Sequence, residues 1–155
     1  METVISILHV TGAVFIVGPM AVLPMSALRA ARKGHAQQVA TLARSTAVFS
    51  YLSLIVFLLG FALVGLADPE YDLSITTPWV LASIVLYLIA VAVSVFVVVP
   101  AMKRAARDAD AGAAAVSDGG TSGAVAVAGR AALTAGSGAV AVLLVVVVIL
   151  MVWKP

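Results

Sequence analysis

The stretch from Pro78 to Val99 reads PWVLASIVLYLIAVAVSVFVVV and contains no Asp, Glu, Lys or Arg. About 20 consecutive apolar residues are enough for a helix to cross the roughly 30 Å hydrocarbon core of a bilayer. Three other stretches, at about 3–28, 45–66 and 131–152, have a similar length and the same lack of charged residues. The sequence therefore predicts an all-α fold, a four-helix transmembrane bundle that forms one domain over residues 1–155.

The overall composition indicates a protein whose surface faces lipid. Of its 155 residues, 63% are apolar and only 10% are charged, whereas soluble domains carry about 25% charged residues. The chain has no cysteine, which excludes disulfides, thiol catalysis and thiolate metal sites. The net charge of +2 gives no sign of a nucleic-acid-binding surface, so we expect lipids and other membrane proteins as partners.

The basic residues are distributed unevenly between the two ends of the predicted bundle. Connecting loops at 29–44 and 100–130 contain eight of them, and the opposite end contains only Lys154. Because loops rich in Lys and Arg stay in the cytoplasm, we expect both loops to be cytoplasmic and both termini to lie outside. Residues 108–129 are rich in Ala, Gly and Ser, which predicts a linker with a turn at 118–120 and a first part that extends the third helix.

His9 is the candidate functional residue, because ionisable side chains within a membrane are functional by default. It lies about six residues into the first span, roughly 9 Å from its start at 1.5 Å per residue. Ser83 and Met151 fall at a similar depth on other spans, so Ser83 is a candidate hydrogen-bond partner for His9 and Met151 is a candidate second haem ligand. His9 is therefore interpreted as a structural histidine bonded to a hydroxyl or carbonyl, as a haem or metal ligand with Met151 as a second ligand, or as a protonation switch.

Small residues within the spans predict close helix packing. They are Gly12 and Gly18 in the first span, and Ala132 and Gly136 in the fourth, where Ala131, Ala135 and Ala139 repeat the same spacing of four. Such spacing lets helix backbones approach each other in lipid. The contacts are expected within the bundle or, alternatively, with another membrane protein. Pro19 and Pro24 predict a bend, because each removes a backbone donor from the first span.

The run Leu8 to Gly18, LHVTGAVFIVG, resembles the first helix of an uncharacterised bacterial family of small four-helix predicted integral membrane proteins. It is more distantly similar to the HemJ-type protoporphyrinogen oxidases and to the membrane domain of copper-resistance protein D. This resemblance implies a bacterial inner (plasma) membrane protein, and implies haem binding at the position of His9. The HemJ-type proteins also use a basic residue in a later helix, whereas no predicted span of this chain contains Lys or Arg, and Pro19 replaces a family glycine.

The same spans contain no carboxylate, which ion-coupled transporters normally keep in the membrane. The chain also has no nucleotide-binding loop, zinc-protease motif or nucleophile elbow. We therefore expect a protein that is not an enzyme and needs no cofactor: an accessory subunit of a larger bacterial membrane complex, with the respiratory chain as first candidate. The alternative is a haem-b-binding membrane protein that uses His9 for electron transfer or haem handling.

Overall fold

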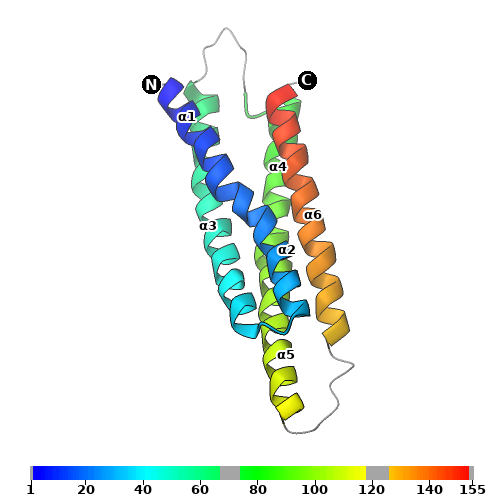
Figure 1. The fold of residues 1–155 in the computed structure, drawn as a ribbon. Coiled ribbons are helices and arrows are strands. Elements are labelled where there is room, and N and C mark those ends of the chain that lie inside the picture. Colours follow the sequence, from blue (N-terminus) through cyan, green and yellow to red (C-terminus); the bar gives the residue numbers. More distant parts are fainter. Residues whose placement is uncertain (1, 67–73, 118–125, 154–155) are drawn as a thin grey trace.

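The computed structural model describes residues 2–66, 74–117 and 126–153, and these form four long helical rods (Figure 1). Their elements in chain order are α1 (Glu2–Gly12), the π-helical segment η1 (Ala13–Val17), α2 (Gly18–Arg32), α3 (Ala36–Leu66), α4 (Pro78–Val93), the π-helical segment η3 (Ser94–Val98), α5 (Val99–Ser117) and α6 (Ala126–Trp153). All four rods are long and apolar enough to cross a membrane. The predicted all-α four-helix bundle is confirmed.

The two basic connections are largely helical, although the sequence predicted loops over 29–44 and 100–130. α2 continues to Arg32, α3 already begins at Ala36, and α5 continues to Ser117. Alanine-rich sequence favours helix even where charges end the apolar run. The predicted extension of the third helix is thus present, and the predicted turn at 118–120 lies outside the described residues.

A tight turn joins the first two rods. Gly34 has φ of +75°, a conformation that costs glycine little because it has no Cβ. The backbone N–H of His35 donates to the carbonyl of Ala30 at 3.0 Å, and that of Gly34 donates to Ala31 at 3.2 Å. This pair of bonds is the Schellman arrangement that satisfies the last carbonyls of a helix. The turn therefore reverses the chain within three residues.

Each π-helical segment ends two residues before a proline. The sequence V-F-I-V-G-P over 14–19 recurs as V-F-V-V-V-P over 95–100, and η1 and η3 occupy these two places. Proline removes a helical hydrogen bond and crowds the carbonyl four residues earlier, and a widened π turn is one of the ways in which a helix accommodates the break. The predicted bend at Pro19 thus takes the form of a π turn, and Figure 1 shows the first rod leaning across the bundle there.

The two halves of the chain have the same order of elements, although no internal repeat is evident from the sequence. Each half consists of an α segment, a π segment, an α segment and a returning helix. The shared pattern is six residues long and is surrounded by unrelated apolar sequence, so it does not stand out by composition. We call it the V-F-x-V-x-P repeat.

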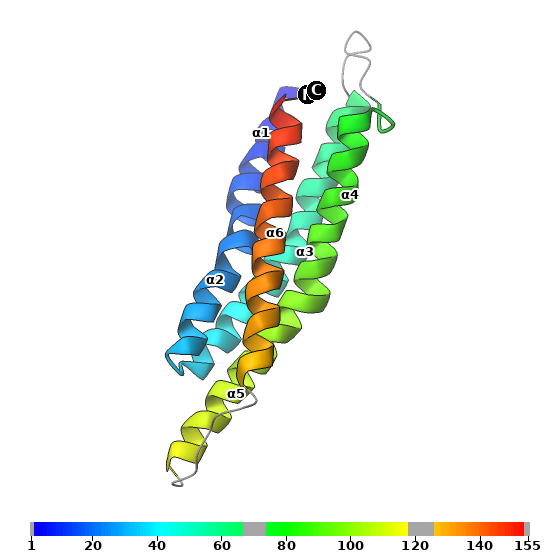
Figure 2. The ribbon, with the colours of Figure 1, turned by 90° about the vertical axis from the view of Figure 1, so that its right-hand side faces the viewer.

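The bundle is packed tightly at one end and loosely at the other. We call the end with the turn at Gly34 the basic end and the end with the two termini the terminal end (Figures 1 and 2). Toward the basic end, α2, α3, α5 and α6 pack against one another. Toward the terminal end, α1 packs on α3 and α4 packs on α6, while α1 makes no extended contact with α4 or α6 among the described residues.

The two ends lie on opposite sides of the bundle, so their placement relative to the membrane can be tested directly. Alkaline phosphatase, which is active only outside the cytoplasm, is expected to be active when fused after Trp153 and inactive when fused after Gly34. The physical reason is the excess of Lys and Arg in the connections at the basic end. Activity of the Gly34 fusion together with inactivity of the Trp153 fusion would reverse the orientation.

Candidate functional site: an apolar pocket beside His9

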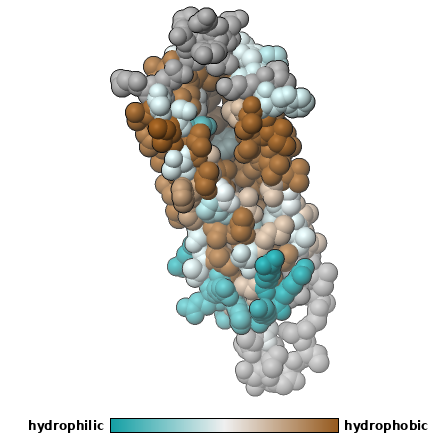
Figure 3. Space-filling model, turned by 45° about the horizontal axis from the view of Figure 1, so that its top comes forward, coloured by the Kyte–Doolittle hydropathy of each residue, from teal (hydrophilic) through white to brown (hydrophobic). Residues whose placement is uncertain are grey.

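A pocket of about 620 Å³ lies between the two helix pairs of the terminal end. This volume is within the range of about 300–1,000 Å³ typical of small-molecule and cofactor sites. Its walls come from all four rods and are almost entirely aliphatic and aromatic. Figure 3 shows the molecule hollowed between apolar side chains at this end. The site is therefore an apolar chamber in which very few polar atoms are available to a ligand.

His9 supplies the imidazole on one wall of the pocket. Its Nδ1 lies 2.9 Å from the backbone carbonyl oxygen of Val56 on α3. A carbonyl can only accept, so Nδ1 carries the proton and donates it to this bond. Gly60 makes room for the ring, since a Cβ at that position would lie 3.1 Å from His9 Cε1. The ring is thus fixed in position and in tautomer by one face of α3.

The other ring nitrogen, Nε2, is open to the pocket. Among the described residues no hydrogen bond is formed by Nε2, and no buried side-chain nitrogen or oxygen lacks a partner. His9 itself is only half-buried, so Nε2 is accessible rather than sealed. In the neutral ring a protonated Nδ1 leaves Nε2 with a free lone pair. Nε2 is therefore an acceptor or ligand atom that faces an apolar chamber.

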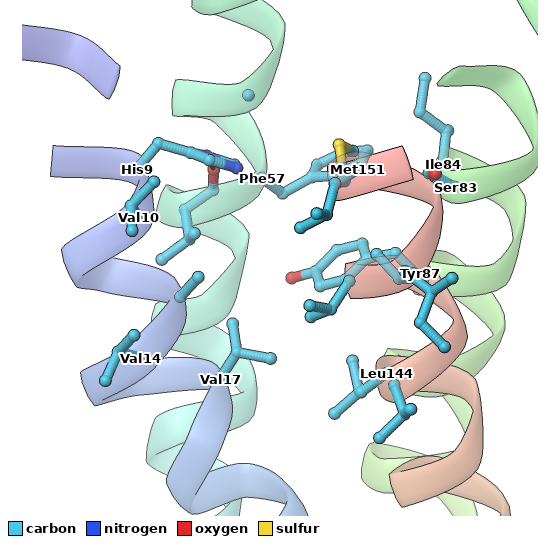
Figure 4. A pocket seen from close by; sticks show the side chains of 18 of the residues that line it. His9, Val10, Val14, Val17, Phe57, Ser83, Ile84, Tyr87, Leu144 and Met151 are labelled. Atoms are coloured by element: carbon cyan, nitrogen blue, oxygen red, sulfur yellow. Dashed lines mark hydrogen bonds between the residues drawn. The ribbon is translucent and has the colours of Figure 1, made fainter. Parts of the chain in front are cut away.

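The two other residues predicted at this depth have different roles. Met151 of α6 lines the same pocket as His9, and Figure 4 shows the two on opposite walls. Ser83 of α4 also lines the pocket, but its hydroxyl donates to the carbonyl of Trp79 at 2.8 Å. The interpretation of Ser83 as the partner of His9 is therefore wrong, because a carbonyl on the adjacent helix α3 is already within reach.

The four predicted packing residues divide into two groups. Gly12 and Gly136 make close contacts: a Cβ would lie 2.8 Å from Val56 Cγ2 in the first case and 3.0 Å from Val98 Cγ2 in the second. Gly18 has nothing within 4 Å of such a Cβ, and Ala132 is exposed. Gly18 and Ala132 therefore make no close packing contact with the part of the chain that the structure describes. The buried side of α6 runs through Leu133, Gly136, Val140 and Leu144.

A row of buried hydroxyl groups closes the space between α3 and α4 below the pocket, and sequence reasoning did not find it. Ser53 donates to the carbonyl of Ser50, and Ser50 donates to the carbonyl of Thr46, each at 2.8 Å. Each serine oxygen can therefore only accept from the neighbouring rod. Tyr87 must donate to Ser53 at 2.7 Å, and Ser94 must donate to Ser50 at 2.8 Å.

This assignment of donors predicts unequal effects of two substitutions on one bond. Tyr87→Phe removes the donor and is expected to cost about 0.6 kcal/mol, the average for such bonds in membrane proteins. Ser53→Ala leaves the phenol as a buried donor without an acceptor and is expected to cost roughly 1–3 kcal/mol. Equilibrium unfolding of both variants in mixed micelles gives the two values. A larger loss for Tyr87→Phe would reverse the assignment.

The fold and the pocket together define a multi-pass helical membrane protein with a chamber inside its bundle. Residues 3–155 match the family model described as "Predicted integral membrane protein (DUF2269)". The chain therefore belongs to this family of predicted integral membrane proteins. No curated protein and no solved structure matches the chain.

Proposed function

We propose that the protein binds haem b in this pocket, with His9 as an axial ligand. The observation that carries the proposal is the hydrogen bond from Nδ1 to the Val56 carbonyl, which leaves Nε2 facing the chamber. Histidines that ligate metals almost always donate their other ring N–H to a carbonyl, carboxylate or water, which fixes the tautomer. The resemblance of Leu8–Gly18 to the first helix of the HemJ-type proteins, as read from the sequence, implies the same assignment.

The residues that line the pocket fit haem in their donor atoms and in their apolar character. The Met151 thioether and the His9 imidazole are a pair of axial ligands used by cytochromes, and both residues line the chamber. Valine, leucine and phenylalanine side chains form most of the walls and suit the faces of a macrocycle. No Lys or Arg lines the pocket among the described residues, so His9, Met151 and the apolar side chains would hold the group without charged partners for its propionates.

When bound, haem would supply one-electron chemistry. The chain's own contribution is to hold the imidazole in one orientation and to exclude water from it. Gly60 leaves space for the imidazole ring, and the Val56 carbonyl accepts the hydrogen bond that orients it. The apolar walls exclude water, because a chamber with few polar atoms does not bind ordered water well. This arrangement suits electron transfer or haem handling.

The direct test is the absorption spectrum of the chain purified alone in mild detergent. A Soret band with about one haem per chain is expected, either on isolation or after titration with haemin. Reduction with dithionite should sharpen the visible bands of a six-coordinate haem if Met151 is the second ligand. A folded chain that neither carries haem nor takes up haemin would contradict the proposal.

A second function, an accessory subunit of a larger membrane complex such as a respiratory assembly, is supported by a different observation. Ala131, Ala132, Ala135 and Ala139 are all exposed on α6. Small residues at a spacing of four allow close helix approach, and within the described residues this row does not face another helix of the chain. The row would suit a transmembrane helix of another subunit. A bacterial inner membrane remains the proposed location.

The partner helix can be tested by enlarging one small residue. Ala135→Leu is expected to remove most of the protein that co-purifies with the native chain, because the added side chain prevents close approach. Val142→Leu is the matched control, since Val142 is exposed on the same helix but already bulky. Native mass spectrometry of both preparations gives the subunit content. Equal recovery of partners from both variants would exclude the alanine row as the contact.

A further inference from the structure

We propose that the pocket is filled from the membrane, through a side opening between α1 and α6, so that its ligand is a lipid-soluble molecule rather than one taken from water. The inference concerns the same pocket as the proposed function, but it does not require that haem is the ligand. The helix pairs of the terminal end meet at two places. One is the α3–α4 seam and the other is the α1–α6 seam.

The α3–α4 seam is closed by side chains. The rings of Phe57 and Tyr87 stack with centroids 4.8 Å apart, and Tyr87 also donates to Ser53. Deeper in the bundle, Ser94 donates to Ser50 across the same seam. Every pocket residue contributed by α3 and α4 is buried or half-buried. These contacts close the α3–α4 seam from the level of Phe57 and Tyr87 toward the basic end.

The α1–α6 seam is open. Val10 and Val14 on one side are about 59% and 61% exposed, and Val145 and Val148 on the other are about 57% and 56% exposed, although all four line the pocket. Residues that both line a chamber and face outward mark its opening. The opening ends toward the basic end, where α2 packs on α6. Its edges are aliphatic, which suits contact with lipid chains and not with water.

The V-F-x-V-x-P repeat explains why one seam is closed and the other is not. Tyr87, which closes the α3–α4 seam, lies eight residues before Val95. The residue eight positions before Val14 in the other copy is Ser6. A serine side chain is too short to reach across a seam as the phenol of Tyr87 does. The side opening therefore follows from a difference between two otherwise similar halves.

A tryptophan reporter distinguishes entry from lipid and entry from water without any ligand. Trp79 and Trp153 are replaced by phenylalanine, and Ile84→Trp places the reporter on the pocket wall. The chain is inserted into phosphatidylcholine nanodiscs with or without dibrominated acyl chains. Bromine in the acyl chains is expected to quench the reporter strongly, and aqueous iodide is expected to have little effect.

Two double variants test whether the quenching depends on the α1–α6 seam. Val14→Phe with Val148→Phe narrows the opening and is expected to remove most of the quenching by brominated lipid. Val22→Phe with Val142→Phe is the matched control, since both residues are exposed but neither lines the pocket. Quenching by iodide instead of brominated lipid, quenching by neither, or equal quenching in both double variants would overturn the inference. Failure of haem to bind would leave these results unchanged, so the two proposals fail separately.

Discussion

The His9→Gln variant is expected to lose the Soret absorbance of the purified chain entirely. An amide is a poor axial ligand, whereas the Nε2 atom of His9 is a free acceptor that faces the chamber. The glutamine side chain can still donate a hydrogen bond to the Val56 carbonyl, so the fold is expected to remain. The measurement is the haem content per chain, with circular dichroism of the same sample as evidence of folding.

Two companion variants make this result specific to ligation. Ser83→Ala is the matched control, because Ser83 lines the pocket but bonds only to the carbonyl of Trp79, and its haem content should be that of the native chain. His9→Gly should regain a Soret band when imidazole is added, because free imidazole can occupy the vacated space. Full haem content in His9→Gln would refute His9 as the ligand.

Gly136→Leu is expected to destabilise the bundle by about 1–3 kcal/mol, the usual cost of overpacking a tight contact. Even a single added Cβ would lie 3.0 Å from Val98 Cγ2 and 3.6 Å from Val97 Cγ1, so a leucine cannot be accommodated without separating α6 from η3. Val146→Leu is the matched control, since Val146 is exposed on the same helix. Unfolding free energies in the same micelles compare them, and equal values would show that the close contact is absent.

Gly12 provides an independent test of close packing that also affects the pocket. A Cβ there would lie 2.8 Å from Val56 Cγ2, and Val56 is the residue whose carbonyl accepts the bond from His9. Gly12→Leu should therefore lower stability and haem affinity together, whereas Gly136→Leu acts at a distance from the imidazole. If Gly12→Leu lowers stability but leaves haem affinity unchanged, the position of the His9 ring does not depend on this contact.

The four rods could be predicted because hydrophobic length is a local property of the sequence. The extent of α2 and α3 could not be predicted in the same way, since the charges near Arg29 and Arg44 end the apolar run while alanine continues the helix. A bend at Pro19 could be predicted, but its form could not. Proline removes one donor in any helix, and whether the turn before it widens depends on how the neighbouring helices pack.

The candidate site could be predicted only in part, because it depends on the rotation of each helix about its own axis. His9 was identified by its chemistry, but its partner is a backbone carbonyl, which every residue carries and no sequence pattern marks. Ala132 and Gly136 share a spacing of four, yet Ala132 is exposed while Gly136 is buried. The small size of a residue permits close packing between helices, but the neighbouring helix that makes the contact is known only from the fold.

The V-F-x-V-x-P repeat occurs once in each half of the bundle, and the halves α1–α3 and α4–α6 have the same order of elements. His9 lies five residues before Val14, and the residue at the same distance before Val95 is Ala90, which is fully buried. Ala90 belongs to the packed core and does not line the chamber, whereas His9 does. The two halves of the chain therefore contribute unequally, and only the first half supplies a nitrogen ligand atom to the chamber.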